Sequence, residues 1–287
     1  PSYEESRRDL ILGVDLLATQ YAGYRAFASI QGIRGDDKAA LKYLQSASEV
    51  KSLVNTKWWS NSGGYFFGFL DSNHHFQGRA GADLLYRDVT DDGPKTQSAL
   101  GTLLNQMRSE PASQVERKSH YAEILYRYGN PDAAYAQIMD LVQTGRERRE
   151  YPEVSYSVVG AIVNGLMGIN VEPDLSIEDI AHGEQFEAVV RTLPQLTGKT
   201  EWAEVRNLPV QSTFISVRHE GERSTVFSNQ GQSGLVWEAK FPGSFATLIV
   251  NGKATEAHTA SEFPNRRLTW VRVPVQAGAT ARVEVPK

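Results

Sequence analysis

The 287-residue sequence contains no cysteine, which excludes a disulfide framework, a thiolate metal site and a cysteine nucleophile. It also lacks a run of about 18 apolar residues, so no membrane-spanning helix is expected. Gly-x-Ser-x-Gly, the phosphate-binding loop, the dinucleotide fingerprint and the calcium-loop pattern are all missing. These absences argue against serine-hydrolase and nucleotide chemistry, and we expect neither a cofactor nor a metal ion.

Neither sign of charge dominates. The formal net charge is -4, and Lys and Arg are spread along the chain rather than clustered. Proteins that bind nucleic acid or anionic membranes concentrate basic residues in patches, so neither partner is expected here. A neutral polar substrate fits this charge balance better.

The length exceeds the usual size of one core and predicts two domains. Apolar residues recur at helical spacing through the first part, beginning with Leu10, Leu12, Val14 and Leu16. One helix should start at Asp36, which can cap its first turn, and end at the Trp58-Trp59 pair. Further helices are expected at residues 96–108, 115–128, 131–142 and 155–167.

The apolar period changes to two in the last part of the chain. Strands are expected at residues 213–218, 224–228, 234–239, 246–250 and 268–273. Turns should separate them at residues 220–222 and 229–231 and at Asn251-Gly252, a strong hairpin signal. We therefore expect a helical domain at 1–172, a linker at 173–206 with one short helix near 186–191, and an antiparallel β-sandwich at 207–287. Trp237 and Trp270 should both lie in the sandwich core.

Four stretches carry a likeness to a known family. They are Trp58-Trp59 followed by Ser62-Gly-Gly-Tyr-Phe-Phe, Ser119-His-Tyr-Ala-Glu-Ile-Leu, Tyr151-Pro-Glu-Val-Ser-Tyr-Ser, and the tail from Leu193-Pro-Gln-Leu-Thr to Val250-Asn-Gly-Lys. Together they resemble the C-terminal portion of bacterial (α/α)6-barrel glycoside hydrolases that end in a β-sandwich. The likeness covers nearly the whole chain, although none of these stretches is a catalytic signature.

This resemblance implies an incomplete (α/α) toroid of helical hairpins followed by an antiparallel β-sandwich. The chain supplies about half of the helices of such a barrel. We therefore expect further polypeptide, either upstream of Pro1 or on a second chain, to complete it. The resemblance also implies that the substrate is an oligosaccharide or polysaccharide and that the protein is periplasmic or secreted.

Glycoside hydrolysis requires two carboxyl groups, about 5.5 Å apart for retention of configuration or about 6.5 to 9.5 Å apart for inversion. Glu150 and Glu153 are the first candidates, because they flank a Tyr-Pro pair just before a helix rich in small residues. The alternative is structural: Glu153 would stabilise the helix dipole and Glu150 would pair with Arg148 or Arg149.

Glu123 is a second-rank catalytic candidate. It lies three residues after His120, so the two side chains are neighbours on a helix surface and could form an acid–base pair or hold substrate. Alternatively, Glu123 pairs with Arg127 one helical turn later, and His120 caps a packed face.

The segment from Tyr65 to Gly78 combines aromatic residues with polar ones and could form the wall of a sugar subsite. The expected substrate-binding residues here are Tyr65, Asp71, Asn73, His74 and His75. Trp59 could add a stacking platform, although a Trp at a helix end is more often a core residue. The structural alternative for the whole segment is a β-hairpin packed against the helices.

Two other functions remain open. A polysaccharide lyase would use His75, Asn73, Tyr65 and Arg79 to remove a proton next to a uronate, and it would need a basic cleft. A non-catalytic helical scaffold would instead bind a partner through its open helical face.

Overall fold

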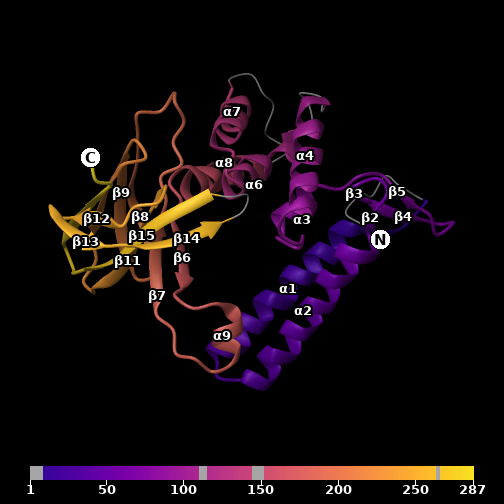
Figure 1. Cartoon of the computed structure of the whole chain (residues 1–287), viewed down its shortest axis with the longest axis horizontal. Coiled ribbons are helices and arrows are strands. Elements are labelled where there is room, and N and C mark those ends of the chain that lie inside the picture. Colours follow the sequence, from indigo (N-terminus) through magenta and orange to yellow (C-terminus); the bar gives the residue numbers. More distant parts are fainter. Residues whose placement is uncertain (1–8, 110–114, 144–151, 263–265) are drawn as a thin grey trace. The chain divides into compact units, whose positions relative to one another are not determined.

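The computed structural model describes residues 9–109, 115–143, 152–262 and 266–287 (Figure 1). The chain forms two compact units. Unit 1 comprises Pro1–Pro111 and Leu175–Phe186, and unit 2 comprises Ala112–Asp174 and Glu187–Lys287. The chain therefore leaves unit 2 after Asp174, contributes a short segment to unit 1, and returns at Glu187.

Unit 1 is built on an antiparallel hairpin of two long helices, α1 (Val14–Ile33) and α2 (Asp37–Lys57) (Figure 1). The turn between them contains Gly35 at φ +77°, a left-handed conformation that glycine adopts without strain. The Asp36 carboxylate accepts a hydrogen bond from the Ala39 amide (3.0 Å) and caps α2. Trp58 is the C-cap residue, so the predicted limits of this helix are confirmed.

Shorter elements complete unit 1. They are the helices α3 (Ala82–Tyr86), α4 (Pro94–Ser109) and α9 (Ile177–Ala181), a three-stranded sheet of β1 (Leu10–Gly13), β4 (Phe69–Asp71) and β5 (Phe76–Gln77), and the pair β2 (Trp59–Ser60) and β3 (Tyr65–Phe66). α9 packs against α1 and α2. Leu10 and Leu12, which fit the helical spacing, lie in β1 instead, because the chain there pairs with β4.

The helical part of unit 2 consists of short helices. They are α5 (Val115–Lys118), α6 (Tyr121–Arg127), α7 (Pro131–Leu141), α8 (Pro152–Gly160) and the π-helix η1 (Ala161–Leu166). Residues 115–128 thus form two helices rather than the predicted one. A turn at Ser119 and His120 separates them, and no Gly or Pro marks this break in the sequence.

Two sheets make up the rest of unit 2. The six-stranded sheet has the order β13-β12-β16-β10-β9-β8 and the five-stranded sheet the order β14-β15-β11-β7-β6. Their strands are β6 (Asn170–Pro173), β7 (Ala188–Thr192), β8 (Trp202–Val210), β9 (Thr213–Glu220), β10 (Ser224–Asn229), β11 (Leu235–Pro242), β12 (Thr247–Val250), β13 (Lys253–Glu256), β14 (His258–Glu262), β15 (Arg266–Val275) and β16 (Thr280–Glu284). The five strands predicted from the period of two are all confirmed.

The core of the sandwich lies between the two sheets. The rings of Phe227 on β10 and Trp237 on β11 are both fully buried and stack with centroids 4.9 Å apart. The Trp237 indole donates a hydrogen bond to the Thr192 hydroxyl (2.9 Å), so its polar atom is satisfied in the core. The predicted core position of Trp237 is confirmed.

The prediction for Trp270 is wrong. Strand β15 pairs with β11 in a register that places Trp237 opposite Val273 and Lys240 opposite Trp270, so the two tryptophans lie on opposite faces of their sheet. Trp270 is only partly buried and stacks on the exposed His258 (4.3 Å). Alternation along a strand fixes which residues share a face but not which face is the core.

Residues expected to form a linker contain regular structure. α9, β7 and the beginning of β8 all fall within residues 173–206. The short helix predicted near 186–191 is wrong, because Ala188–Thr192 runs parallel to β11 as a strand of the sheet. The segment 229–231 connects β10 to β11, which belong to different sheets, so it is not a hairpin turn.

Asn251-Gly252 does form the predicted hairpin between β12 and β13. Both residues have positive φ, +49° and +82°, as the favoured two-residue hairpin turn requires. In the described part of the chain, no helix is both long and apolar enough to cross a membrane.

Candidate functional site

An aromatic cluster surrounds the hairpin of β2 and β3 in unit 1. Trp58 contacts Phe76, Phe76 stacks on Phe67, and Phe67 contacts Tyr65, with ring centroids between 5.0 and 5.3 Å apart. The guanidinium carbon of Arg79 lies 4.3 Å from the centre of the Tyr65 ring. The aromatic cluster is thus a continuous row of rings that ends in a cation.

The members of the aromatic cluster differ in burial. Trp58 is 3% exposed and serves as a core residue, whereas Tyr65 and Phe67 are partly buried and Phe76 is exposed. Trp59 is also partly buried and adjoins the cluster, with its ring against the buried Phe66 (4.9 Å). Partly exposed rings can stack on the apolar face of a sugar, and a guanidinium beside them can donate hydrogen bonds to the sugar hydroxyl groups. A packed hairpin and a sugar-binding surface were alternatives for this segment, and its structure is compatible with both.

Asp71 organises the turn that follows β4. Its Oδ1 accepts hydrogen bonds from the backbone amides of Asn73 and His75 (2.9 Å each), and its Oδ2 accepts one from Gln77 (3.3 Å). These bonds, above all that from the His75 amide, lower the pKa of Asp71 below its usual value. Asp71 is therefore a structural anion that orients the turn.

The tip of this turn is exposed. Asn73, His74 and His75 all reach solvent, and His74 has φ +63°, an uncommon value for a residue other than glycine. The structure thus holds three hydrogen-bonding side chains at a fixed tip next to the aromatic cluster. No group of three His, Asp or Glu side chains suited to a metal ion occurs among the described residues.

Glu123 and His120 lie at the start of α6 in unit 2. Glu123 Oε1 is 3.5 Å from Arg127 Nη2, the i, i+4 ion pair that the spacing offered as its structural alternative. His120 is exposed and precedes the first residue of α6. Opposite them, Tyr121, Ile124 and Leu125 are buried, so the polar pair lies on the outer side of a packed helix.

Glu150 lies outside the described residues. Glu153 belongs to the first turn of α8, directly after Pro152, and its side chain also lies outside the described part. Their assignment as catalytic carboxyl groups stays a prediction.

Unit 1 also contains a shallow pocket of about 420 Å³ that no sequence motif indicates. It is lined by Gly32, Ile33, Gly35, Asp37, Ile180, Gly183, Glu184, Gln185 and Phe186. The loop after α9 forms one wall and the turn between α1 and α2 forms the other. Sequence reasoning missed it because its two carboxylates, Asp37 and Glu184, come from segments far apart in the chain.

Burial shifts the pKa of His219, Tyr126 and Glu222 in unit 2, and no motif signalled these shifts. It lowers the pKa of His219 to about 4 and raises that of Tyr126, whose hydroxyl has no hydrogen-bond partner among the described residues. Desolvation also raises the pKa of Glu222, opposed by the charge of Arg266. Glu222 is exposed in the turn between β9 and β10, so solvent screens this effect.

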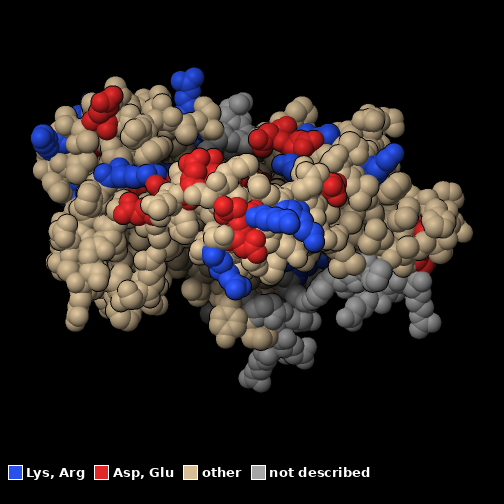
Figure 2. All heavy atoms as spheres, turned by 90° about the horizontal axis from the view of Figure 1, so that it is seen from below, with Lys and Arg blue, Asp and Glu red and all other residues tan. Residues whose placement is uncertain are grey.

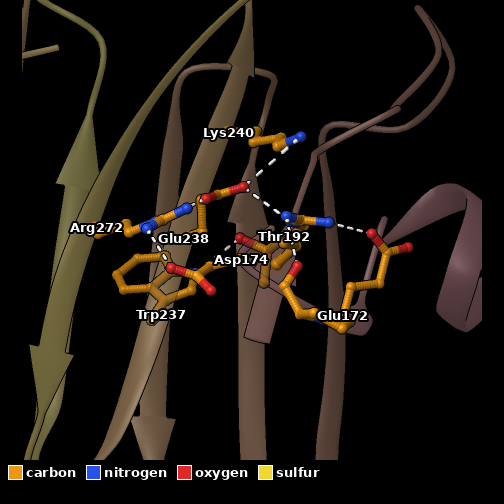
Figure 3. A network of polar contacts seen from close by, with 9 residues as sticks. Glu172, Asp174, Thr192, Trp237, Glu238, Lys240 and Arg272 are labelled. Carbon is orange, nitrogen blue, oxygen red and sulfur yellow. Dashed lines mark hydrogen bonds and ion pairs between the residues drawn. The ribbon is translucent and has the colours of Figure 1, made fainter. Parts of the chain in front are cut away.

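An ion-pair network crosses the five-stranded sheet (Figure 3). The Glu238 carboxylate is 3% exposed and lies between Arg191 Nε (2.9 Å) and Arg272 Nε (3.0 Å), with Lys240 Nζ at 3.7 Å. Arg191 also pairs with Glu172, and Arg272 pairs with Asp174 (3.2 Å). Because every carboxylate in this network has a cationic partner, its arrangement is that of a structural clamp.

Figure 2 shows acidic and basic side chains interspersed on one face of the molecule, with most of that surface neither acidic nor basic.

Comparison with known proteins adds evidence on the fold. No protein-family model matches the sequence, and no curated protein matches it. A solved structure, the α-L-rhamnosidase from Dictyoglumus thermophilum, matches 92% of this chain with a TM-score of 0.56 and 15% sequence identity. The chain spans 31% of the length of that enzyme. The predicted fold class, an incomplete toroid of helical hairpins followed by a β-sandwich, is confirmed, and it is a fold found in a glycoside hydrolase.

Proposed function

We propose that this chain is part of a glycoside hydrolase that cleaves an oligosaccharide or polysaccharide by a two-carboxylate mechanism. The observation that carries the proposal is the match of 92% of the chain to the fold of an α-L-rhamnosidase. Low sequence identity leaves the sugar open, so an α-L-rhamnoside is the first substrate to test rather than the expected one. We propose a periplasmic or secreted location, where polysaccharides are accessible.

In this proposal Glu153 acts as one of the two carboxyl groups, with Glu150 as its neighbour. One carboxyl must be protonated to donate to the leaving oxygen, and the other must be ionised to act as base or nucleophile. Glu123 ranks behind them because its carboxylate is already paired with Arg127.

The aromatic cluster and the neighbouring turn are the proposed substrate-binding elements. Trp59 and Tyr65 are only partly buried, so their rings can contact sugar faces. Asp71 would act indirectly by holding Asn73 and His75 at the tip of the turn, because its own oxygens accept bonds from the turn itself. His74 is a further proposed binding residue of unit 1. His120 is proposed separately as a binding residue of unit 2.

We also propose that further helices cover one face of α1. Large apolar side chains are exposed along it, namely Leu16 (37%), Phe27 (42%), Ile30 (51%) and Ile33 (53%). Leu16, Phe27 and Ile30 follow helical spacing and form a stripe of the kind that faces a neighbouring helix. Helices of the same barrel, on the same protein or on a second chain, are the proposed partners of this stripe.

The catalytic proposal is tested on the complete natural gene product with a panel of aryl glycosides that includes an α-L-rhamnoside. Glu153→Gln should abolish turnover while circular dichroism shows an unchanged fold. Glu256→Gln is the matched control, because Glu256 is exposed on β13 and should be dispensable. Unchanged turnover in the Glu153 variant would remove this residue from the mechanism.

A polysaccharide lyase is the second candidate, favoured by the position of Arg79 against Tyr65. A tyrosine beside a cation is suited to removing a proton next to a uronate carboxylate. The two functions differ in their products, since a lyase releases an unsaturated sugar that absorbs ultraviolet light and a hydrolase does not. Incubation with polygalacturonate and with neutral glycans therefore distinguishes them.

A further inference from the structure

The outer face of the six-stranded sheet presents two large exposed aromatic side chains. Trp202 on the edge strand β8 and Phe214 on β9 are each 53% exposed. On β9 the alternate residues Ile215, Val217 and His219 are buried between the sheets, so Phe214 lies on the opposite, outer face. Neither aromatic residue contributes to the core.

Charged residues around Trp202 form one continuous chain of ion pairs. The pairs are Arg206–Glu204 (2.7 Å), Arg218–Glu204 (3.8 Å), Arg218–Glu220 (3.4 Å), Arg282–Glu220 (3.2 Å) and Arg282–Glu284 (3.3 Å). Three arginines balance three glutamates, so this surface offers hydrogen-bond donors and acceptors without net charge. Such a surface suits a neutral, hydroxyl-rich ligand better than a polyanion.

Arg218 fixes the orientation of the indole. Its guanidinium carbon lies 4.5 Å from the centre of the Trp202 ring, while its nitrogens are held by Glu204 and Glu220. A preoriented aromatic ring loses little freedom when a ligand stacks on it. Trp202 therefore has the properties of a stacking platform with polar groups at its border.

The spacing of the two aromatics indicates the size of the ligand. Trp202 pairs with Glu220, which follows Phe214 by six residues on β9. At about 3.4 Å per residue, the two side chains stand about 20 Å apart on one face. An extended chain of several sugars can reach both rings, whereas a monosaccharide can reach only one.

We propose that this outer face binds a strand of neutral polysaccharide, with Trp202 and Phe214 as stacking platforms and the ion-pair chain as hydrogen-bonding border. This binding surface contains none of the residues proposed above for catalysis. It requires no turnover, so it can hold whether or not the chain belongs to a hydrolase.

Affinity electrophoresis of the full chain in gels containing xylan, galactomannan or mixed-linkage β-glucan tests the proposal, with polygalacturonate as the anionic comparison. At least one neutral polysaccharide should retard the protein. Trp202→Ala should weaken that binding by about tenfold or more, as expected for a central aromatic anchor, and Trp202→Phe should restore part of it. Trp270→Ala, on the other sheet, is the matched control and should bind like the parent chain.

The melting temperature of each variant checks that it is folded. Retardation by none of the three neutral polysaccharides, retardation by polygalacturonate alone, or undiminished binding by Trp202→Ala would each overturn the proposal.

Discussion

Acidification is expected to destabilise unit 2 through a single imidazole. His219 is completely buried in the sandwich, where its Nε2–H donates to the Met167 carbonyl (3.0 Å) and its Nδ1 accepts from the Thr225 hydroxyl (2.8 Å). A carbonyl can only accept, which fixes this neutral tautomer. Protonation would place a second N–H against the hydroxyl and a charge in an apolar core.

The magnitude follows from the change in pKa on folding. Burial lowers the pKa of His219 from 6.5 to about 4, against the opposing effect of the Met167 carbonyl. Because the unfolded chain binds this proton more tightly than the folded one, stability falls as the pH drops below 6.5. The loss should reach about 2 to 3 kcal/mol at pH 4.5 and about 3 kcal/mol well below pH 4.

Urea denaturation of the parent chain and of His219→Gln between pH 7.5 and 4.5 measures this effect. The variant should be less stable at pH 7.5, because it loses packing and a hydrogen bond. Its deficit in stability relative to the parent chain should shrink by about 2 to 3 kcal/mol at pH 4.5, since glutamine does not titrate. His258→Gln, which removes an exposed imidazole instead of the buried one, is the matched control. Parallel curves for the parent chain and His219→Gln would refute this reasoning.

Three further changes test the packing. Gly165→Ala places a Cβ 2.3 Å from the buried ring of Tyr126 and should lower the free energy of unfolding by about 2 kcal/mol, whereas Gly160→Ala, with no atom within 4 Å, should not lower it. Glu238→Gln leaves the cations of the clamp without their shared carboxylate and should cost about 2 to 3 kcal/mol in urea denaturation, an upper figure because the arginines are partly solvated. Asp36→Ala removes the N-cap of α2 and should lower the melting temperature, because the free energy of unfolding falls by about 1 kcal/mol. Unchanged stability in Gly165→Ala, Glu238→Gln or Asp36→Ala would contradict the corresponding contact.

Features set by neighbouring residues could be predicted from the sequence. The limits of α2 follow from Asp36, whose side chain reaches an amide three residues on. The hairpin at Asn251-Gly252 follows from the tolerance of both residues for positive φ. Each depends on a few adjacent residues, so the local sequence contains the whole signal.

Features set by distant pairing could not be predicted. β7 is a strand because β11, far along the chain, runs parallel to it, and the two tryptophans of the sandwich separate to opposite faces only through the register of β11 with β15. The same limit applies to the site. The ion pair of Glu123 with Arg127 could be predicted, because the two residues are one helical turn apart in the sequence. The contact of Arg79 with Tyr65 could not, because it forms only when the β2–β3 hairpin and the chain after β5 come together.

Hydrolysis itself provides the most direct test of the central claim. The complete natural gene product should be incubated with aryl glycosides and with neutral polysaccharides, and the release of reducing ends should be followed for the parent protein and for Glu153→Gln. Glycoside hydrolysis by the parent protein and its loss in the folded variant is the predicted result. Failure of the folded parent protein to hydrolyse any of these substrates would contradict the claim.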